Sequence, residues 1–595
     1  MPQPSLIQRL KDRKLVQWAV AYLAGAWVLV EATGHVVEQF HWPIIVSQVI
    51  TIMAFFGFFL VVVIAWYHGE EGRQWVSGPE LLIIALLLLI SGGVLSMLGD
   101  GERVSEPGEA VASDTDEDGR PRIAVLPCEN FSPDPEEAFF ASGIHEEILL
   151  KLQKISSLFS IGRTSVLQYA ENPPPVNEIA DALGVGFLGE CSVRKEGDRI
   201  RLTFQLLDGT TGGQLWAENY DRDLSAGNLL DIQSDIARQV ARALEAELTP
   251  EERSALEQDR TEVTAAYEEH LLGRFHLHQR TTEGFERAIA EFERAVELDP
   301  TYAPAYASLA SAYSLCVTYG YRSGPAAYEA TTRALIVADR ALELDPNQAE
   351  AYAARAYVLR YMWAPFEGLA SDYLRAIQLQ PSSGDIHGWY GHLLTREGRF
   401  EEAMVEHQNA VTLDPLAPGR RAGFTWDALA ARQYDVVVRE ADRALALVPG
   451  FFDPLGAKAL AHLLVGEEDL CLPLDLGPYA GIKAMCLHAA GEVEAASAMV
   501  DSVSAVVEAS RASDPIPGSA IQAASIATYY AWVGEPRQSL AWFERALALS
   551  PESTLYRILE SEVYDNVRSD AEFWSGIESL REDLRARLNE GRQGG

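Results

Sequence analysis

The pattern of apolar and polar positions changes several times along the chain. Three runs that are almost entirely apolar occupy residues 15–37, 44–67 and 81–98, and residues 99–121 are acidic. From residue 122 onward, apolar residues recur with the spacings of strands and amphipathic helices. The pattern predicts a mainly α, multidomain protein with a three-helix transmembrane anchor, a small α/β domain and an α-solenoid.

The three apolar runs predict three transmembrane helices, because a helix of about 20 apolar residues spans the ~30 Å hydrocarbon core. Positive residues gather ahead of the first run, at Arg9, Lys11, Arg13 and Lys14. Residues 1–14 are therefore expected in the cytoplasm, and the acidic linker and all that follows on the far side. In a bacterium with two membranes the predicted location is the inner membrane, with the soluble domains in the periplasm. An inverted topology with a cytosolic solenoid is the alternative.

The first predicted transmembrane helix carries three ionisable residues on one face, Glu31, His35 and Glu38. One interpretation places them in water at the outer interface. The other places them inside the helix bundle as an ionisable cluster, since carboxylates within a membrane usually serve function.

Residues 122–250 predict a small α/β domain. Strands are expected at 123–127, 158–162, 187–194, 199–207 and 214–220, and helices at 136–154, 176–183 and 224–248. The last three strands alternate apolar and polar residues and are joined by glycine-containing turns, so an antiparallel meander is expected.

Several short motifs in this region carry a family resemblance. They are Ile123-Ala-Val-Leu-Pro127, Ala141-Ser-Gly-Ile-His-Glu-Glu147, Ile161-Gly-Arg-Thr-Ser-Val166, Glu178-Ile-Ala-Asp-Ala-Leu-Gly184, Ser192-Val-Arg194, Gly197-Asp-Arg199, Leu215-Trp-Ala-Glu218 and Tyr220-Asp-Arg222. Together they resemble the TolB amino-terminal-domain-like, or FlgO-like, family. The resemblance implies an α/β domain of the bacterial envelope, frequently followed by tetratricopeptide repeats and without established chemistry of its own. The chain departs from the family pattern at Cys128, where an aromatic residue is common, and at Cys191, where glycine is expected.

The segments Lys11-Asp-Arg-Lys-Leu-Val16 and Ala26-Trp-Val-Leu29 resemble the membrane leader that often precedes such domains. Relatives of this architecture can carry a winged-helix DNA-binding domain or a nucleotide cyclase ahead of the membrane. Because only 14 residues precede the first predicted helix, neither output domain is expected. The chain is accordingly predicted not to be an enzyme.

A short phrase that begins with alanine and ends with proline recurs through the second half of the chain. It ends at Pro300, Pro346, Pro381, Pro415, Pro449 and Pro551. The intervals of 35, 34 and 34 residues between positions 346 and 449 match one tetratricopeptide helix pair. Residues 264–560 are therefore identified as a tetratricopeptide solenoid with two degenerate units between 450 and 517, and residues 561–595 as a C-terminal helix and tail.

The repeat phase predicts which residues line the concave wall of the solenoid. The candidate partner-binding residues are Tyr357, Arg360, Tyr361, His392, Thr395, Arg396, Thr528 and Trp532. Arginine and aromatic side chains suit an extended peptide or its carboxylate. Ordinary surface and packing between repeats explains the same residues equally well.

The net charge and the positions of the cysteines limit the kinds of partner and of site that the chain is expected to have. The net charge of -38 opposes binding to a phosphate backbone, so protein or peptide partners and a lipid bilayer are expected, and no nucleic acid. The five cysteines, Cys128, Cys191, Cys316, Cys471 and Cys486, lack close pairs and are interpreted as buried small side chains. The sequence predicts no catalytic residues, no cofactor and no metal site, and the neighbouring His276 and His278 lack further ligands at fixed spacing.

These patterns favour a membrane-anchored scaffold for protein–protein interaction in the bacterial cell envelope. The alternative is a membrane sensor that relays ligand binding to a separate cytoplasmic effector.

Overall fold

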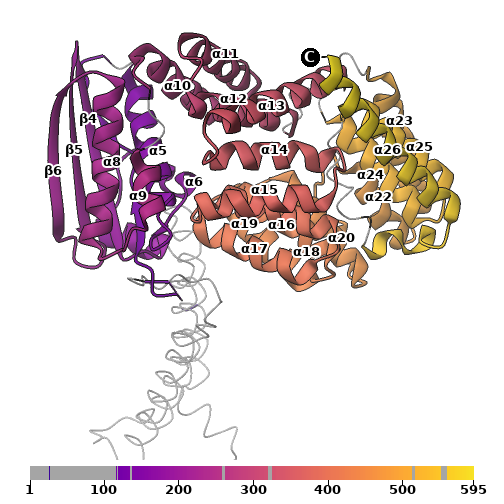
Figure 1. The fold of residues 1–595 in the computed structure, drawn as a ribbon. Coiled ribbons are helices and arrows are strands. Elements are labelled where there is room, and N and C mark those ends of the chain that lie inside the picture. Colours follow the sequence, from indigo (N-terminus) through magenta and orange to yellow (C-terminus); the bar gives the residue numbers. More distant parts are fainter. Residues whose placement is uncertain are drawn as a thin grey trace, which may run out of the picture. The chain divides into compact units, whose positions relative to one another are not determined.

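The computed structural model describes residue 26 and residues 115–594, apart from 117, 135–136, 258–260, 319–323, 512–515, 517, 551–558 and 560. Apart from residue 26, the three predicted transmembrane segments, with Glu31, His35 and Glu38, lie outside the described residues, and so does most of the acidic linker. Among the described residues, no helix has both the length and the apolar character needed to cross a membrane. The α/β region and the helical repeats belong to one compact unit, Ala110–Gly595 (Figure 1).

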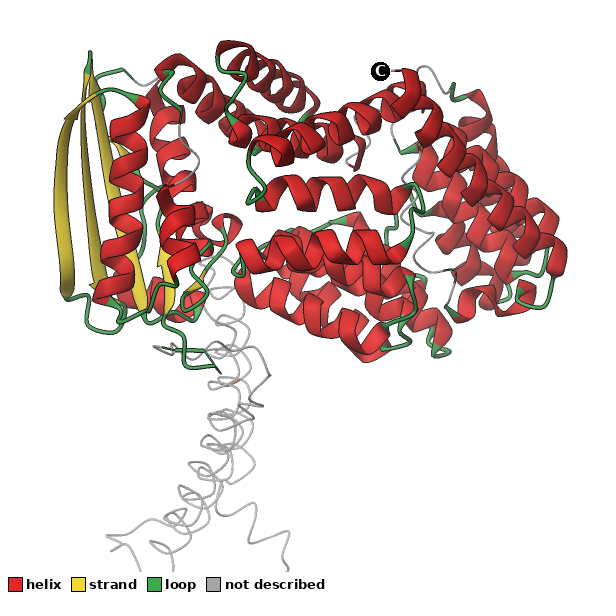
Figure 2. Cartoon of the chain, viewed as in Figure 1, coloured by secondary structure: helices red, strands yellow, loops and turns green. Residues whose placement is uncertain are grey.

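A mixed sheet forms the core of the α/β region (Figure 2). Its strand order is β3-β1-β4-β5-β6. Strand β1 (Arg122–Val125) lies parallel to β3 (Phe159–Ser160) and to β4 (Phe187–Glu196). Strands β4, β5 (Arg199–Asp208) and β6 (Gln214–Asp223) run antiparallel, which confirms the predicted meander. The two-residue β2 (Glu129–Asn130), which pairs with β4, was not predicted because it is too short to show an alternating pattern.

Helices cover both faces of the parallel part of the sheet. On one face, α5 (Ala138–Gln153) and α8 (Ala226–Ala243) bury a core that includes Ile123 and Val125 of β1 (Figure 1). On the other, α6 (Arg163–Val166) and α7 (Val176–Leu183) cover Ala124. Successive side chains of a strand point to opposite faces, so the apolar run of β1 supplies both cores. The short α9 (Pro250–Glu257) follows α8.

Antiparallel helix pairs make up the repeat region. They are α10 (Thr264–Leu277) with α11 (Thr282–Leu298), α12 (Ala303–Thr318) with α13 (Gly324–Leu344), α14 (Ala349–Tyr361) with α15 (Phe366–Leu379), α16 (Gly384–Arg396) with α17 (Phe400–Leu413), α18 (Pro418–Ala430) with α19 (Tyr434–Leu447), α20 (Phe452–Leu464) with α21 (Glu468–Cys471), α22 (Ala480–Ala489) with α23 (Val493–Ala509), and α24 (Ser519–Trp532) with α25 (Pro536–Leu549). The two degenerate units predicted between 450 and 517 are α20–α21, whose second helix has a single turn, and α22–α23.

The alanine that opens each copy of the recurring phrase explains the pairing. These alanines are completely or almost completely buried: Ala295, Ala341, Ala376, Ala410, Ala444 and Ala546. A methyl group is the largest side chain that lets two helix backbones approach closely at these points. Each helix pair leaves an apolar face that only the next pair can cover, so the pairs stack.

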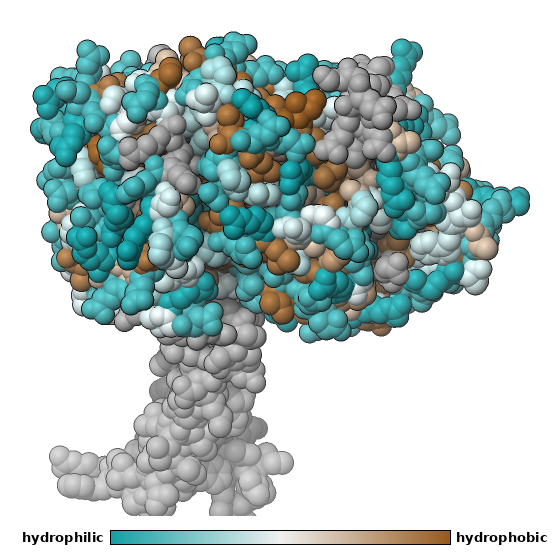
Figure 3. All heavy atoms as spheres, viewed as in Figure 1, coloured by the Kyte–Doolittle hydropathy of each residue, from teal (hydrophilic) through white to brown (hydrophobic). Residues whose placement is uncertain are grey.

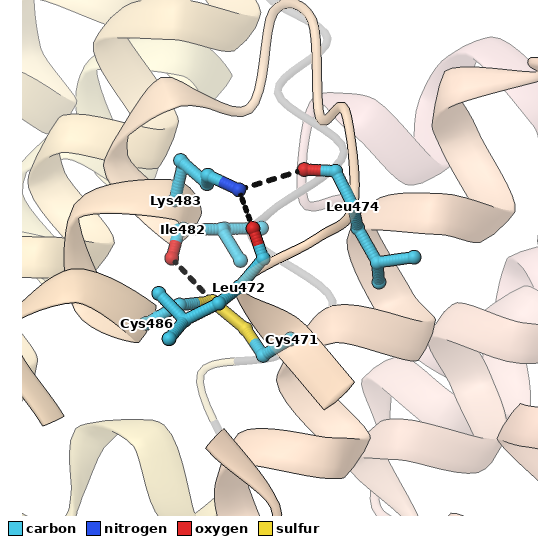
Figure 4. Close-up of a disulfide and its surroundings, with 6 residues drawn as sticks. All are labelled: Cys471, Leu472, Leu474, Ile482, Lys483 and Cys486. Carbon is cyan, nitrogen blue, oxygen red and sulfur yellow. Dashed lines mark hydrogen bonds between the residues drawn. A yellow bond between two sulfur atoms is a disulfide. The ribbon is translucent and has the colours of Figure 1, made fainter. Parts of the chain in front are cut away.

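Four of the five cysteines form disulfides, so their interpretation as unpaired buried side chains was wrong. Cys128 pairs with Cys191 of β4, with a Cα–Cα distance of 4.6 Å. Cys471 at the end of α21 pairs with Cys486 of α22, with a Cα–Cα distance of 5.9 Å (Figure 4). The fold brings together cysteines 63 and 15 residues apart, which no sequence spacing revealed. Cys316 is a buried thiol, as predicted.

The last helix, α26 (Ala571–Gly594), follows the 3₁₀ turn η4 (Glu562–Val567) and packs against α13 and α25. Leu584 is buried in the same apolar cluster as residues of α12, α13 and α14. The guanidinium of Arg581 lies 3.9 Å from the ring centre of Trp363, and Arg585 Nε donates to the Trp363 carbonyl oxygen (2.9 Å). The C-terminal helix therefore contacts helix pairs that lie more than 200 residues earlier in the chain.

Candidate functional site

The structure places the predicted groove residues of α14 largely inside the repeats. Tyr357 and Arg360 are only 4% and 5% exposed. The Arg360 guanidinium lies 4.3 Å from the ring centre of Tyr361 and 5.2 Å from that of Tyr357. This arrangement stabilises the charge by cation–π contact within the protein and leaves little of it for a partner.

Arg396 of α16 joins this group. Its guanidinium donates to the carbonyl oxygens of Arg360 (3.2 Å) and Ala364 (3.1 Å) and lies 5.4 Å from the Trp363 ring centre. Thr395, the preceding residue, is buried. Four predicted residues, Tyr357, Arg360, Tyr361 and Arg396, therefore meet around the end of α14, where α26 also packs. Sequence reasoning predicted a C-terminal helix within residues 561–595 but not its packing against this group, because nothing in the repeat phase indicates where a terminal helix returns.

The remaining predicted residues lie elsewhere. Thr528 of α24 is buried and shares a hydrogen bond with the Tyr564 hydroxyl (2.9 Å). Trp532 is partly exposed, and its ring stands edge-on to that of His488 at 5.5 Å. His392 contacts the Asp427 carboxylate. Whether any of the eight residues binds a partner stays a prediction.

The α/β region is joined to the repeats by buried charges. Glu146 of α5, 5% exposed, accepts hydrogen bonds from Arg274 Nη2 (2.5 Å) and His278 Nε2 (2.6 Å) of the first helix pair. Burial alone would raise the pKa of Glu146, but the charges of Arg274 and His278 hold it well below its ordinary value. Arg274 also reaches Glu350 of α14 (3.0 Å), so one guanidinium links three elements.

A second junction uses the loop that follows α17. The Asp414 carboxylate accepts hydrogen bonds from the Ser165 backbone N–H (2.9 Å) and hydroxyl (2.5 Å). The Gly162 N–H donates to the Leu413 carbonyl oxygen (2.7 Å), and the Leu416 N–H donates to Ser165 Oγ (2.9 Å). Asp414 belongs to the recurring phrase, so a repeat signature also serves as the docking point of the α/β region.

A cavity of about 140 Å³ lies between the two junctions. Its walls carry charges of both signs, from Arg163, Arg274, Arg280 and Arg420 and from Glu146, Glu350, Asp385 and Asp414. The opposite charges are interleaved, as at Arg274–Glu146 and Arg420–Asp385. The arrangement joins the two domains and has no excess of either sign to select a charged ligand.

A third cluster joins neighbouring helix pairs. His392 of α16 and His407 of α17 both donate hydrogen bonds to Oδ2 of Asp427 on α18, the latter at 2.5 Å. Burial would raise the pKa of Asp427, but the two histidines hold it well below its ordinary value. Sequence analysis placed His392 in the groove and did not connect it with His407 and Asp427, which lie on other helices.

The chain matches no known family model, and the TolB-like or FlgO-like resemblance stays a prediction. The chain is 37% identical over 209 residues to a protein of Rhizobium meliloti (strain 1021) named "Putative adenylate cyclase 3". The match covers 35% of this chain and 35% of that protein, so the chain spans about a third of the length of the relative. The prediction that the chain is not an enzyme is contradicted by this match, because the relative carries an enzyme name.

Solved structures that resemble part of the chain include tetratricopeptide proteins. One is YrrB, described as a protein with an unusual peptide-binding site (19% identity, 35% of this chain and 96% of that chain, TM-score 0.25). Others are PilF of Pseudomonas aeruginosa (17% identity, 39% and 97%, TM-score 0.29) and PilW, a type IV pilus biogenesis factor (18% identity, 35% and 94%, TM-score 0.30). The assignment of helical repeats rests on the helix pairs described above.

Proposed function

We propose that the protein is a membrane-anchored scaffold of the bacterial cell envelope that binds protein or peptide partners. The observation that carries the proposal is the buried docking of the α/β region on the repeats through Glu146 and Asp414. These contacts join a sheet domain and an array of stacked helix pairs into one platform. Stacked helix pairs offer extended surfaces on which partners bind.

A second candidate function is a sensor that passes a binding event to an adenylate cyclase. The similarity to the cyclase-named relative favours it, since the two proteins share a segment of 209 residues. Under this proposal the shared segment is a regulatory portion that recognises the same kind of partner in both proteins.

The proposed compartment is the periplasm, with the apolar runs before residue 99 as the membrane anchor. Two disulfides support it, because disulfides persist in oxidising compartments and are rare in the bacterial cytosol. Alkaline phosphatase fused after Arg120 should be active if this topology is right. Inactive phosphatase together with an active cytosolic reporter at the same position would contradict it.

Site-specific photocrosslinking in cells tests the scaffold. A photoreactive amino acid would replace the partly exposed Tyr361 or Trp532, and Val405, an exposed residue of α17, serves as the control position. The proposal expects one discrete protein band from Tyr361 or Trp532 and none from Val405. Identical products from all three positions, or no product from any of them, would contradict binding at the predicted wall.

Cyclic AMP measurements separate the two candidate functions. If the chain regulates a cyclase, cells that lack it should show an altered cyclic AMP level that the wild-type chain restores. If the cyclic AMP level is unchanged while the crosslinks still form, the sensor proposal is wrong and the scaffold proposal stands.

A further inference from the structure

Three side chains from three successive helices meet at one point inside the repeats. His392 comes from α16, His407 from α17 and Asp427 from α18. Each offers one metal-ligating atom, and these atoms all lie within 4.8 Å of one another. The Asp427 side chain is fully buried, that of His407 is 2% exposed and that of His392 is 13% exposed.

Two glycines leave the space that the imidazoles fill. A Cβ atom at Gly391 would lie 2.8 Å from His407 Nε2, and one at Gly423 would lie 2.9 Å from His392 Cε1. The His407 ring also stacks on Phe424, with ring centres 5.2 Å apart. Gly391 occupies a small position expected of any tetratricopeptide repeat, but Gly423 lies on the next helix pair and faces the other histidine. Packing therefore holds both imidazoles against the same carboxylate.

The donor set has a specific chemistry. Two imidazole nitrogens and one carboxylate oxygen are the protein ligands of many Zn²⁺ sites, and calcium and magnesium prefer oxygen ligands alone. A carboxylate buried this deeply is costly unless positive charge or hydrogen bonds compensate it. A divalent cation between the three groups would provide that compensation directly.

We propose that His392, His407 and Asp427 bind a divalent transition-metal ion of the zinc class. The protein supplies three ligands, so a solvent molecule would take the fourth position, which is compatible with the 13% exposure of the His392 side chain. Ligand atoms of a tetrahedral zinc site lie roughly 3.3 Å apart when each bond is about 2.0–2.1 Å. The Asp427 carboxylate oxygen, now hydrogen-bonded to both imidazoles, must therefore turn away from each by somewhat less than an ångström.

The ion would act as a structural clamp. His392 and His407 belong to the pair α16–α17, and Asp427 belongs to the next pair, α18–α19. Coordination would fix the angle between two adjacent repeats and so the curvature of the surface they present. The same three side chains without a metal make a hydrogen-bonded junction, which is the competing explanation.

Metal binding by the full chain tests the proposal directly. The chain, purified in detergent with a tag that contains no histidine and stripped with a chelator, would be titrated with Zn²⁺ against a chromophoric competitor. We expect about one equivalent to bind in the wild type. His392→Asn should weaken this binding at least tenfold, and Co²⁺ in place of Zn²⁺ should give the visible absorption of a tetrahedral site in the wild type but not in His392→Asn.

A matched control lies on the same two helices. His387 of α16 contacts Glu406 of α17 (2.5 Å) and has no third ligand among the described residues, so His387→Asn should leave the binding unchanged. Asp427→Asn provides a second test variant that retains the size of the side chain. If the wild type binds no Zn²⁺ at micromolar concentration, or His387→Asn loses as much as His392→Asn, the cluster is a hydrogen-bonded junction and the proposal is wrong.

Discussion

At the scale of single residues, the molecule depends on a few charged groups placed deep between its parts. Glu146 is ionised and buried, and Arg274 is its main charge partner. Removing one member of a buried ion pair leaves the other desolvated without compensation, which costs far more than losing a pair at the surface.

Arg274→Met should destabilise the protein by about 3–5 kcal/mol, because Glu146 then stays buried without its guanidinium partner. Arg294→Met is the matched control. Arg294 pairs with Glu269 and Glu291 but is 52% exposed, and such pairs contribute less than about 1 kcal/mol. Urea unfolding followed by circular dichroism measures both variants. Equal losses would show that Glu146 is not held by Arg274.

Because of the buried His145, we expect the free energy of unfolding to fall in acid. Its Nε2 donates to the Val125 carbonyl oxygen (2.9 Å), and burial, helped by the charge of Arg163, lowers its pKa to about 4. The unfolded chain takes up this proton near pH 6.5 and the folded chain does not. Above about pH 6.5 this group therefore leaves the free energy of unfolding at its full value. As the pH drops from 6.5 toward 4, the free energy of unfolding falls by up to about 1.4 kcal/mol per pH unit.

The variant His145→Gln tests this assignment. Its unfolding free energy should depend less steeply on pH between 6.5 and 4 than that of the wild type. Parallel pH profiles for the two proteins would assign the acid sensitivity to other groups.

At the scale of elements, local patterns predicted the helices and strands well, and contacts between distant segments escaped prediction. The phrase ending at Pro415 predicted α17, because alanine and leucine recur there at helical spacing and proline ends the pattern. The pairing of Cys128 with Cys191 depends on β1 and β4 lying side by side. The contact between His392 and Asp427 and the packing of α26 on the early helix pairs likewise depend on the whole fold. Local sequence spacing does not indicate such contacts.

The disulfide between Cys471 and Cys486 should stabilise the degenerate repeats. It closes a loop of 15 residues between α21, which has a single turn, and α22, and the chain-entropy model assigns about 3 kcal/mol to such a loop. Lys483 Nζ donates to the Leu472 and Leu474 carbonyl oxygens within the same loop (Figure 4).

We expect the double change Cys471→Ala, Cys486→Ala to lower the thermal midpoint, and a reductant to lower it in the wild type. The single change Cys316→Ala provides the control, since that thiol joins no disulfide. Titration of the denatured, unreduced wild type should find one thiol per chain. Five thiols would contradict both disulfides.

At the scale of the whole molecule, the α/β region and the repeats form a continuous structure because repeat loops dock on the sheet domain. The face seen in Figure 3 is mostly hydrophilic, with hydrophobic side chains in scattered patches. Independently of that surface, specific polar contacts such as Ser165–Asp414 and a shared buried apolar cluster hold the two parts together.

Asp414→Ala should loosen this docking, and Asp345→Ala is its natural control. Both residues occupy the same position of the recurring phrase, but Asp345 bonds only within its own loop in the contacts described, to the Asn347 N–H (3.0 Å) and to Gln348 (2.7 Å). We expect faster hydrogen exchange around Ser165 in Asp414→Ala and not in Asp345→Ala, measured by mass spectrometry. Equal protection at Ser165 in both variants would contradict a docking role for Asp414.

The return of α26 to Trp363 has a mechanical consequence. An open superhelix of repeats stretches like a spring, because each turn can widen slightly without breaking any contact. Here the final helix, α26, contacts the early helix pairs through Leu584, Arg581 and Arg585. Tension along the array would therefore first have to break these contacts. Under a pulling force this solenoid should resist elongation up to a threshold and then yield abruptly.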